Sequence, residues 1–154
     1  MTEIKVLLVD SQASKFCDVL EEFLNAESVA EYRVISTEEP KAALELLRDA
    51  DVAVIELDLT REAAEHGRGD LPTPEEVHTG YKLLAYTKKN FSRVKVLILA
   101  SLAACAPESL EAERQRALKK GASGFLCKPV PLQTLVDEII KLSAAGEGGQ
   151  KRYK

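Results

Sequence analysis

Acidic, hydroxyl and lysine side chains stand at the ends of several short apolar runs in this sequence. The set comprises Asp10, Ser11, Glu56, Asp58, Ser101 and Lys128. Converging carboxylates can hold Mg²⁺, which prefers oxygen ligands. A lysine and a hydroxyl beside them can neutralise and hydrogen-bond a phosphoryl group, whose transfer depends mainly on positioning and charge. These residue types therefore indicate phosphate chemistry, provided that the fold brings the ends of the runs together.

Apolar runs and amphipathic segments alternate along the chain. The runs predict strands at 4–9, 32–36, 52–57, 94–100 and 125–127. A helix is predicted after each strand, with apolar faces near 16–24 and 40–47 and full spans at 80–90, 107–120 and 132–142. Five such units predict a flavodoxin-like, doubly wound (βα)5 α/β fold, with a five-stranded parallel sheet and helices on both faces. In this fold the carboxyl ends of the strands meet at one edge, where sites gather.

The first predicted helix carries one apolar stripe. Its members recur at i, i+3, i+4, i+7 and i+8, the spacing of one helix face: Phe16, Val19, Leu20, Phe23 and Leu24. Ser11 or Ser14 could cap the start of this helix. We therefore expect an amphipathic helix directly after Asp10.

Length and charge restrict the class of protein. A chain of 154 residues suits one domain, which we expect at 1–143, with a long inserted loop at 60–79 and a flexible tail at 144–154. The net charge of −4 argues against a nucleic-acid partner, and no apolar run approaches the ~18 residues of a membrane span. No secretory signal is visible and the three cysteines form no close pair, so we expect a cytoplasmic protein.

Four segments carry the most specific motifs of the chain, at 5–10, 51–59, 79–84 and 120–129. In the last of them Gly-Ala, an aromatic residue and Lys-Pro follow one another up to Pro129. These segments resemble the receiver domain of bacterial two-component response regulators, over roughly 3–143. The resemblance implies a CheY-like signalling module of phosphorelay systems, with no enzymatic activity beyond self-phosphorylation from a phosphodonor.

The resemblance also assigns roles to the residues at the strand ends. Glu56 stands where the family has its phosphoacceptor aspartate, and Ser11 replaces one of two acidic residues after the first strand. Lys128 matches the pocket lysine, Ser101 lies next to the position of the pocket hydroxyl, and Phe125 matches the switch aromatic. The chain therefore resembles the atypical receivers, or pseudo-receivers, which lack the acceptor aspartate.

These departures have physical consequences. Glutamate is one methylene longer than aspartate, and a displacement of about 1 Å can lower a rate about a hundredfold. A magnesium site made by Asp10, Glu56 and Asp58 would be weak, because Ser11 supplies no carboxylate. Glu56 could instead reach Lys128 and imitate part of a phosphoryl charge, −1 against roughly −1.5 to −2. We expect a receiver whose switch is locked or rewired rather than driven by aspartate phosphorylation.

Other interpretations of the same residues stay open. Asp10, Glu56 and Lys128 could form a purely structural ion-pair cluster, and Phe125 could be an ordinary core aromatic. Asp58 could be the acceptor if the register shifts by two residues, which keeps the facing of the strand. A further alternative is an active, Mg²⁺-dependent phosphoacceptor that uses Glu56 or Asp58, with the metal held by Asp10. A flavodoxin-like nucleotide or flavin binder is the weakest alternative, because no glycine-rich loop follows the first strand.

Only a short tail follows the last predicted helix, so we expect the signal to pass through a partner protein. The resemblance places the partner face on the fourth helix, fifth strand and fifth helix, at 107–120, 125–127 and 132–142. A sensor kinase or a downstream effector would be the partner. The loop at 60–79 could cover the site or present a further surface.

Overall fold

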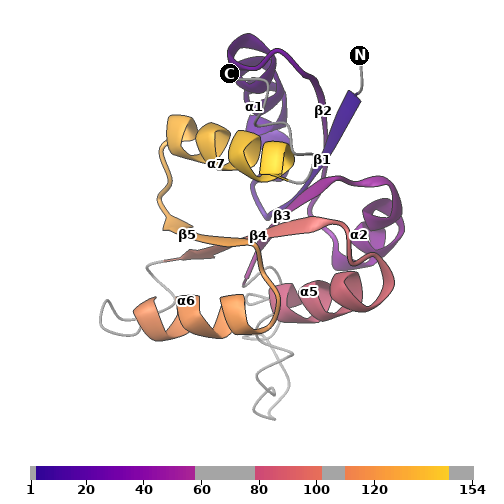
Figure 1. The fold of residues 1–154 in the computed structure, drawn as a ribbon, viewed down its shortest axis with the longest axis vertical. Helices are drawn as coiled ribbons and strands as arrows, with labels where there is room; N and C mark the ends of the chain where they lie inside the picture. The colour runs from indigo at the N-terminus through magenta and orange to yellow at the C-terminus, as the bar shows by residue number, and fades with distance from the viewer. Residues whose placement is uncertain (1–2, 58–78, 102–109, 146–154) are drawn as a thin grey trace.

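The strands form one parallel sheet (Figure 1). The computed structural model describes residues 3–57, 79–101 and 110–145. Its strands are β1 (Glu3–Val9), β2 (Glu31–Thr37), β3 (Val52–Glu56), β4 (Lys95–Ser101) and β5 (Gly124–Lys128). They lie in the order β2-β1-β3-β4-β5, and every neighbouring pair is parallel. The predicted doubly wound α/β fold is confirmed.

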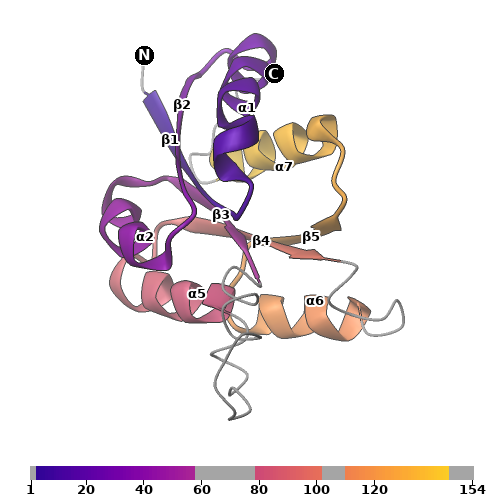
Figure 2. The same ribbon diagram turned by 180° about the vertical axis from the view of Figure 1, so that it is seen from behind.

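Helices cover both faces of this sheet. They are α1 (Ala13–Glu27), α2 (Pro40–Leu46), a 3-10 turn η1 (Leu47–Asp49), α5 (Thr79–Asn90), α6 (Leu110–Lys119) and α7 (Leu132–Ala145). Figures 1 and 2 show α1 and α7 on one face, and α2, α5 and α6 on the other. None of the helices in the described ranges is long and apolar enough to cross a membrane.

The alternation of side chains along the strands divides the core into two layers. Leu8 and Val54 pack in the layer under α1 and α7, whereas Val9 and Ile55 pack in the layer under α2, α5 and α6. All four side chains are fully buried. Successive side chains of a strand point to opposite faces, and helices cover both faces here, so the strands are almost uninterrupted apolar runs.

The last helix is longer than the sequence predicted. α7 ends at Ala145 rather than at 142, so the first two residues assigned to the tail are helical. Ser143 explains this extension: its Oγ lies 2.9 Å from the carbonyl oxygen of Ile139 and 2.7 Å from the hydroxyl of Tyr32 on β2. These contacts hold the last turn against the sheet. The rest of the predicted tail and residues 60–78 of the predicted loop lie outside the described residues.

The start and the apolar stripe of α1 differ from prediction. The helix begins after Gln12 with no side-chain cap, so neither serine caps it. Within the stripe Leu20 is fully buried, whereas the exposed fractions of Val19 and Phe23 are 42% and 40%. The stripe is wider than the strip of α1 that packs on the sheet. Its exposed part leaves Val19 and Phe23 at the surface, and Val19 borders a cavity together with residues of α7.

A partly buried hydrogen bond joins α5 to α6. The hydroxyl of Tyr81 donates to Oε2 of Glu113, and Oε1 of Glu113 pairs with Arg116 at 3.0 Å. Burial raises the pKa of Tyr81 well above its usual value of 10, and the hydrogen bond and negative charge of Glu113 raise it further. The folded protein therefore keeps the proton of Tyr81 at pH values where the unfolded chain releases it.

We expect this tyrosine to make the free energy of unfolding fall as the pH rises above about 10. Below that pH Tyr81 is protonated in both the folded and the unfolded state, so its contribution to stability is complete. Above that pH the unfolded chain loses the proton while the folded protein keeps it, which stabilises the unfolded state. Tyr81→Phe should lower the free energy of unfolding by about 1.5–3 kcal/mol at pH 8, the loss of a hydrogen bond to a charged group. It should also flatten the decline above pH 10 in urea titrations. Tyr86→Phe, on the same helix, is the control, and equal slopes for native protein and Tyr81→Phe would contradict the assignment.

Candidate functional site

The carboxyl edge of the sheet brings together four of the predicted site residues. Glu56, Ser101 and Lys128 are the last residues of β3, β4 and β5, and Asp10 follows β1. Ser101 pairs with Lys128 across the ladder. Side chains alternate between the two faces of each strand, and the register between strands puts all four residues on the same face as Leu8, in the layer under α1 and α7.

Lys128 lies between the two carboxylates. Its Nζ is 2.8 Å from Oδ2 of Asp10 and 3.4 Å from Oε2 of Glu56. The Asp10 side chain is completely buried, and the exposed fractions of Glu56 and Lys128 are 12% and 25%. The contact that the sequence suggested between Glu56 and Lys128 is therefore present, and one ammonium group serves two acids.

The backbone of the β1–α1 turn completes this arrangement. The amide of Ser11 donates to Oε1 of Glu56 at 2.7 Å, and the amide of Gln12 donates to Oδ1 of Asp10 at 2.8 Å. These carboxylates therefore bind the turn that precedes α1, and the helix itself has no side-chain cap. Glu56 also links three parts of the sheet edge, because it belongs to β3 and contacts both Ser11 in the turn after β1 and Lys128 of β5.

Burial and charge act in opposite directions on this cluster. Burial raises the pKa of Asp10 above its usual value, although the hydrogen bonds from Lys128 and from the Gln12 amide lower it in part. Burial by itself lowers the pKa of Lys128, but the hydrogen bond to Asp10 and the charges of Asp10 and Glu56 outweigh it and raise that pKa overall. Lys128 is therefore protonated, and its positive charge stabilises the ionised form of the buried Asp10.

The described residues do not fit a magnesium site. Among them no group of three or more acidic, histidine or cysteine side chains is placed to hold a metal ion. Asp10 and Glu56 both face Lys128, and Oε1 of Glu56 accepts a backbone amide. All four oxygens of these two carboxylates are therefore already engaged, by Lys128 or by the amides of Ser11 and Gln12. Asp58, the third predicted ligand and the alternative acceptor, lies outside the described residues.

The remaining predicted residue, Phe125, lies on the opposite side of the sheet. It is half-buried and packs against the core layer under α2, α5 and α6. Ala100, next to Ser101 on β4, is buried in the same layer. Phe125 is therefore not part of the Asp10–Glu56–Lys128 cluster, although it precedes Lys128 by only three positions on β5.

The sequence did not predict how closely Gly80 approaches the site. Its amide donates to the carbonyl of Leu57 at 3.0 Å. A Cβ atom on Gly80 would lie 2.7 Å from Cα of Leu57 and 2.9 Å from the carbonyl oxygen of Glu56. A glycine at the start of a predicted helix was the available signal, but the backbone that it approaches could be identified only in three dimensions.

Comparisons with known proteins support the fold. No protein-family model matches the chain, and no curated protein matches it by sequence. A solved signal receiver domain from Vibrio parahaemolyticus has a TM-score of 0.68 and 15% identity, covering 99% of each chain. A CheY-like response regulator receiver domain from Methanospirillum hungatei has a TM-score of 0.64 and 17% identity, covering 96% of this chain and 99% of that one.

The non-phosphorylated HemR receiver domain from Leptospira biflexa is similar too. Its TM-score is 0.63 at 22% identity, covering 92% of this chain and 94% of that one. At such identities the likeness shows the fold alone. The chain therefore has the fold of the response regulator receiver domains, as the sequence motifs predicted.

Proposed function

We propose that this chain is an atypical receiver module of phosphorelay-type signal transduction, whose switch is held by Glu56 instead of being set by aspartate phosphorylation. The observation that carries the proposal is the position of Lys128 Nζ, 2.8 Å from Asp10 and 3.4 Å from Glu56. The receiver fold and the motif at 120–129 support it.

Glu56 is poorly disposed to accept a phosphoryl group. Its Oε1 accepts the Ser11 amide at 2.7 Å and its Oε2 faces Lys128, so both oxygens are already engaged. Ser11 also stands where typical receivers have a second acid. The missing carboxylate weakens the binding of the metal ion that phosphoryl transfer requires. Glu56 instead supplies a permanent negative charge to Lys128, where a typical receiver would present a transient one.

The output of such a module would be a contact with another protein. We place the partner face on α6, β5 and α7, with a sensor kinase or a downstream effector as the partner. Lys128 ends β5 and Phe125 lies on the same strand, packed toward α6. A change at the Lys128 cluster would therefore reach this face along β5, between Lys128 and Phe125.

The test is the intact mass of the protein after incubation with Mg²⁺ and acetyl phosphate. We expect no phosphoryl adduct on the native chain. Glu56→Asp should gain one, because the shorter side chain leaves room for a phosphoryl group opposite Lys128. Ser11→Asp/Glu56→Asp should gain it faster, since the second acid completes the metal-binding pair at the end of β1.

Glu56→Gln is the matched control for the charge and should stay unmodified. An adduct on the native chain would overturn the proposal, and peptide mapping would then decide between Glu56 and Asp58. If no variant gains an adduct, the chain would still be an atypical receiver. That result would contradict the claim that Glu56, alone or together with Ser11, prevents phosphorylation.

A further inference from the structure

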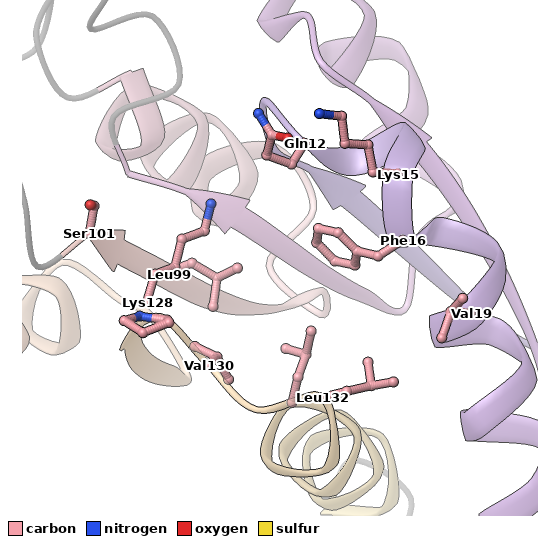
Figure 3. A pocket seen from close by; sticks show the side chains of 11 residues that line it. Gln12, Lys15, Phe16, Val19, Leu99, Ser101, Lys128, Val130 and Leu132 are labelled. Atoms are coloured by element: carbon pink, nitrogen blue, oxygen red, sulfur yellow. The ribbon is translucent and has the colours of Figure 1, made fainter.

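A cavity of about 750 Å³ opens beside the candidate site, between α1, the ends of β4 and β5, and the start of α7 (Figure 3). Its walls are mainly apolar: Phe16 and Val19 come from α1, Leu99 from β4, and Leu132 and Leu135 from α7. Val19 is 42% exposed in this wall. The volume falls within the roughly 300–1,000 Å³ typical of sites that bind small molecules.

Polar groups gather at one end of this cavity. Figure 3 shows Gln12, Lys15, Ser101 and Lys128 toward the carboxyl edge of the sheet, and Val19 and Leu132 at the opposite end. Lys15 is exposed and forms no ion pair with any described residue. A pocket with apolar walls and a lysine at its polar end is complementary to a molecule with an apolar body and an anionic head.

We propose that this cavity binds a small amphipathic anion, with an apolar body between α1 and α7 and a carboxylate-like head at Lys15. The free cation of Lys15 favours an anionic head over a neutral one, because a charge-assisted hydrogen bond is about twice as strong as a neutral one. An apolar ligand body would bind the walls favourably, because it would remove the side chains of Phe16 and Val19 from water. Binding itself does not depend on the proposed signalling function.

The same cavity connects the ligand to the switch. Lys128 lines its polar end while its Nζ holds Asp10 and Glu56. An anionic head held at Lys15 would add negative charge at the end of the cavity where Lys128 pairs with Glu56, so we propose that the ligand acts as the input that phosphorylation supplies in typical receivers. This second part rests on the proposed function.

The test uses decanoate as the anionic probe and decanol as its neutral counterpart, followed by two-dimensional NMR of the full chain. We expect saturable binding of decanoate below about 1 mM, with the largest shifts in α1 and the first turn of α7. Lys15→Glu should weaken decanoate about tenfold and leave decanol unchanged. Lys41→Glu on α2, which covers the other face of the sheet, makes the same charge change and should behave as the native protein.

The apolar wall is tested separately. Val19→Glu should abolish binding of both probes, whereas Val29→Glu, at a valine that is 84% exposed outside the cavity, should not. Both sites are at the surface, so both variants should fold. Absence of saturable decanoate binding, or equal effects of the paired variants, would overturn the proposal. The binding experiments are independent of the phosphorylation test by intact mass. A failure of the proposed binding site can therefore be distinguished from a failure of the proposed function.

Discussion

Lys128→Met should lower the free energy of unfolding by about 2–4 kcal/mol at pH 7. Removing one partner of a buried ion pair leaves the other charge uncompensated, which costs about 3–5 kcal/mol when the pair is fully buried. Asp10 is completely buried here, but Lys128 is 25% exposed, so solvent screening reduces the loss. Methionine keeps most of the apolar stem of lysine, so the difference reports on the charge. Urea denaturation at pH 7 measures it.

The pH dependence of this variant distinguishes a lost charge from lost packing. Burial already raises the pKa of Asp10 in the native protein, and loss of Lys128 removes a group that lowers it. Asp10 in the variant should therefore take up a proton more readily as the pH falls. A protonated Asp10 needs no cation, so the gap between native protein and Lys128→Met should narrow from pH 7 to pH 5.

Asp10→Asn/Lys128→Met is the matched control. The amide keeps an oxygen for the Gln12 amide and carries no charge, so the double variant should recover about half or more of the stability lost by Lys128→Met. A double variant no more stable than Lys128→Met would show that the cost lies in packing. A loss below about 1 kcal/mol in Lys128→Met would mean that water already satisfies Asp10.

Gly80→Ala should destabilise the protein by about 1–3 kcal/mol, although alanine favours helix over glycine by about 1 kcal/mol. The new Cβ would lie 2.7 Å from Cα of Leu57 and 2.9 Å from the carbonyl oxygen of Glu56. Both are backbone atoms, which cannot move aside as the end of a side chain can. The helix or the end of β3 must shift, and Glu56 would move with it.

Ala85→Gly on the exposed side of the same helix is the control for helix propensity. We expect it to lose about 1 kcal/mol from propensity alone. Thermal or urea denaturation of both variants separates the two effects. Gly80→Ala equal to or more stable than the native protein would show that the approach to β3 relaxes without cost.

The sequence by itself determined the order of strands and helices, because each element is a local pattern. Uninterrupted apolar runs such as the one at 52–57 suit strands covered on both faces, and a glycine with φ of 111° at Gly121 ends α6 where the sequence placed a stop. The meeting of Glu56 with Lys128 was also predictable. In a parallel sheet all carboxyl ends lie at one edge, so the separation of these residues along the chain does not matter.

Only the tertiary structure decided how the helices pack on that sheet. Phe16, Val19 and Phe23 belong to one sequence stripe, but Val19 and Phe23 are partly exposed. The packing of α1 and α7 leaves a cavity that Phe16, Val19 and Lys15 border. The hydrogen bond from the Ser11 amide in the β1–α1 turn to Glu56 of β3 has the same origin. Such contacts join residues far apart in the chain. Their geometry depends on how all the side chains of the two core layers pack together, and a local sequence pattern does not determine that packing.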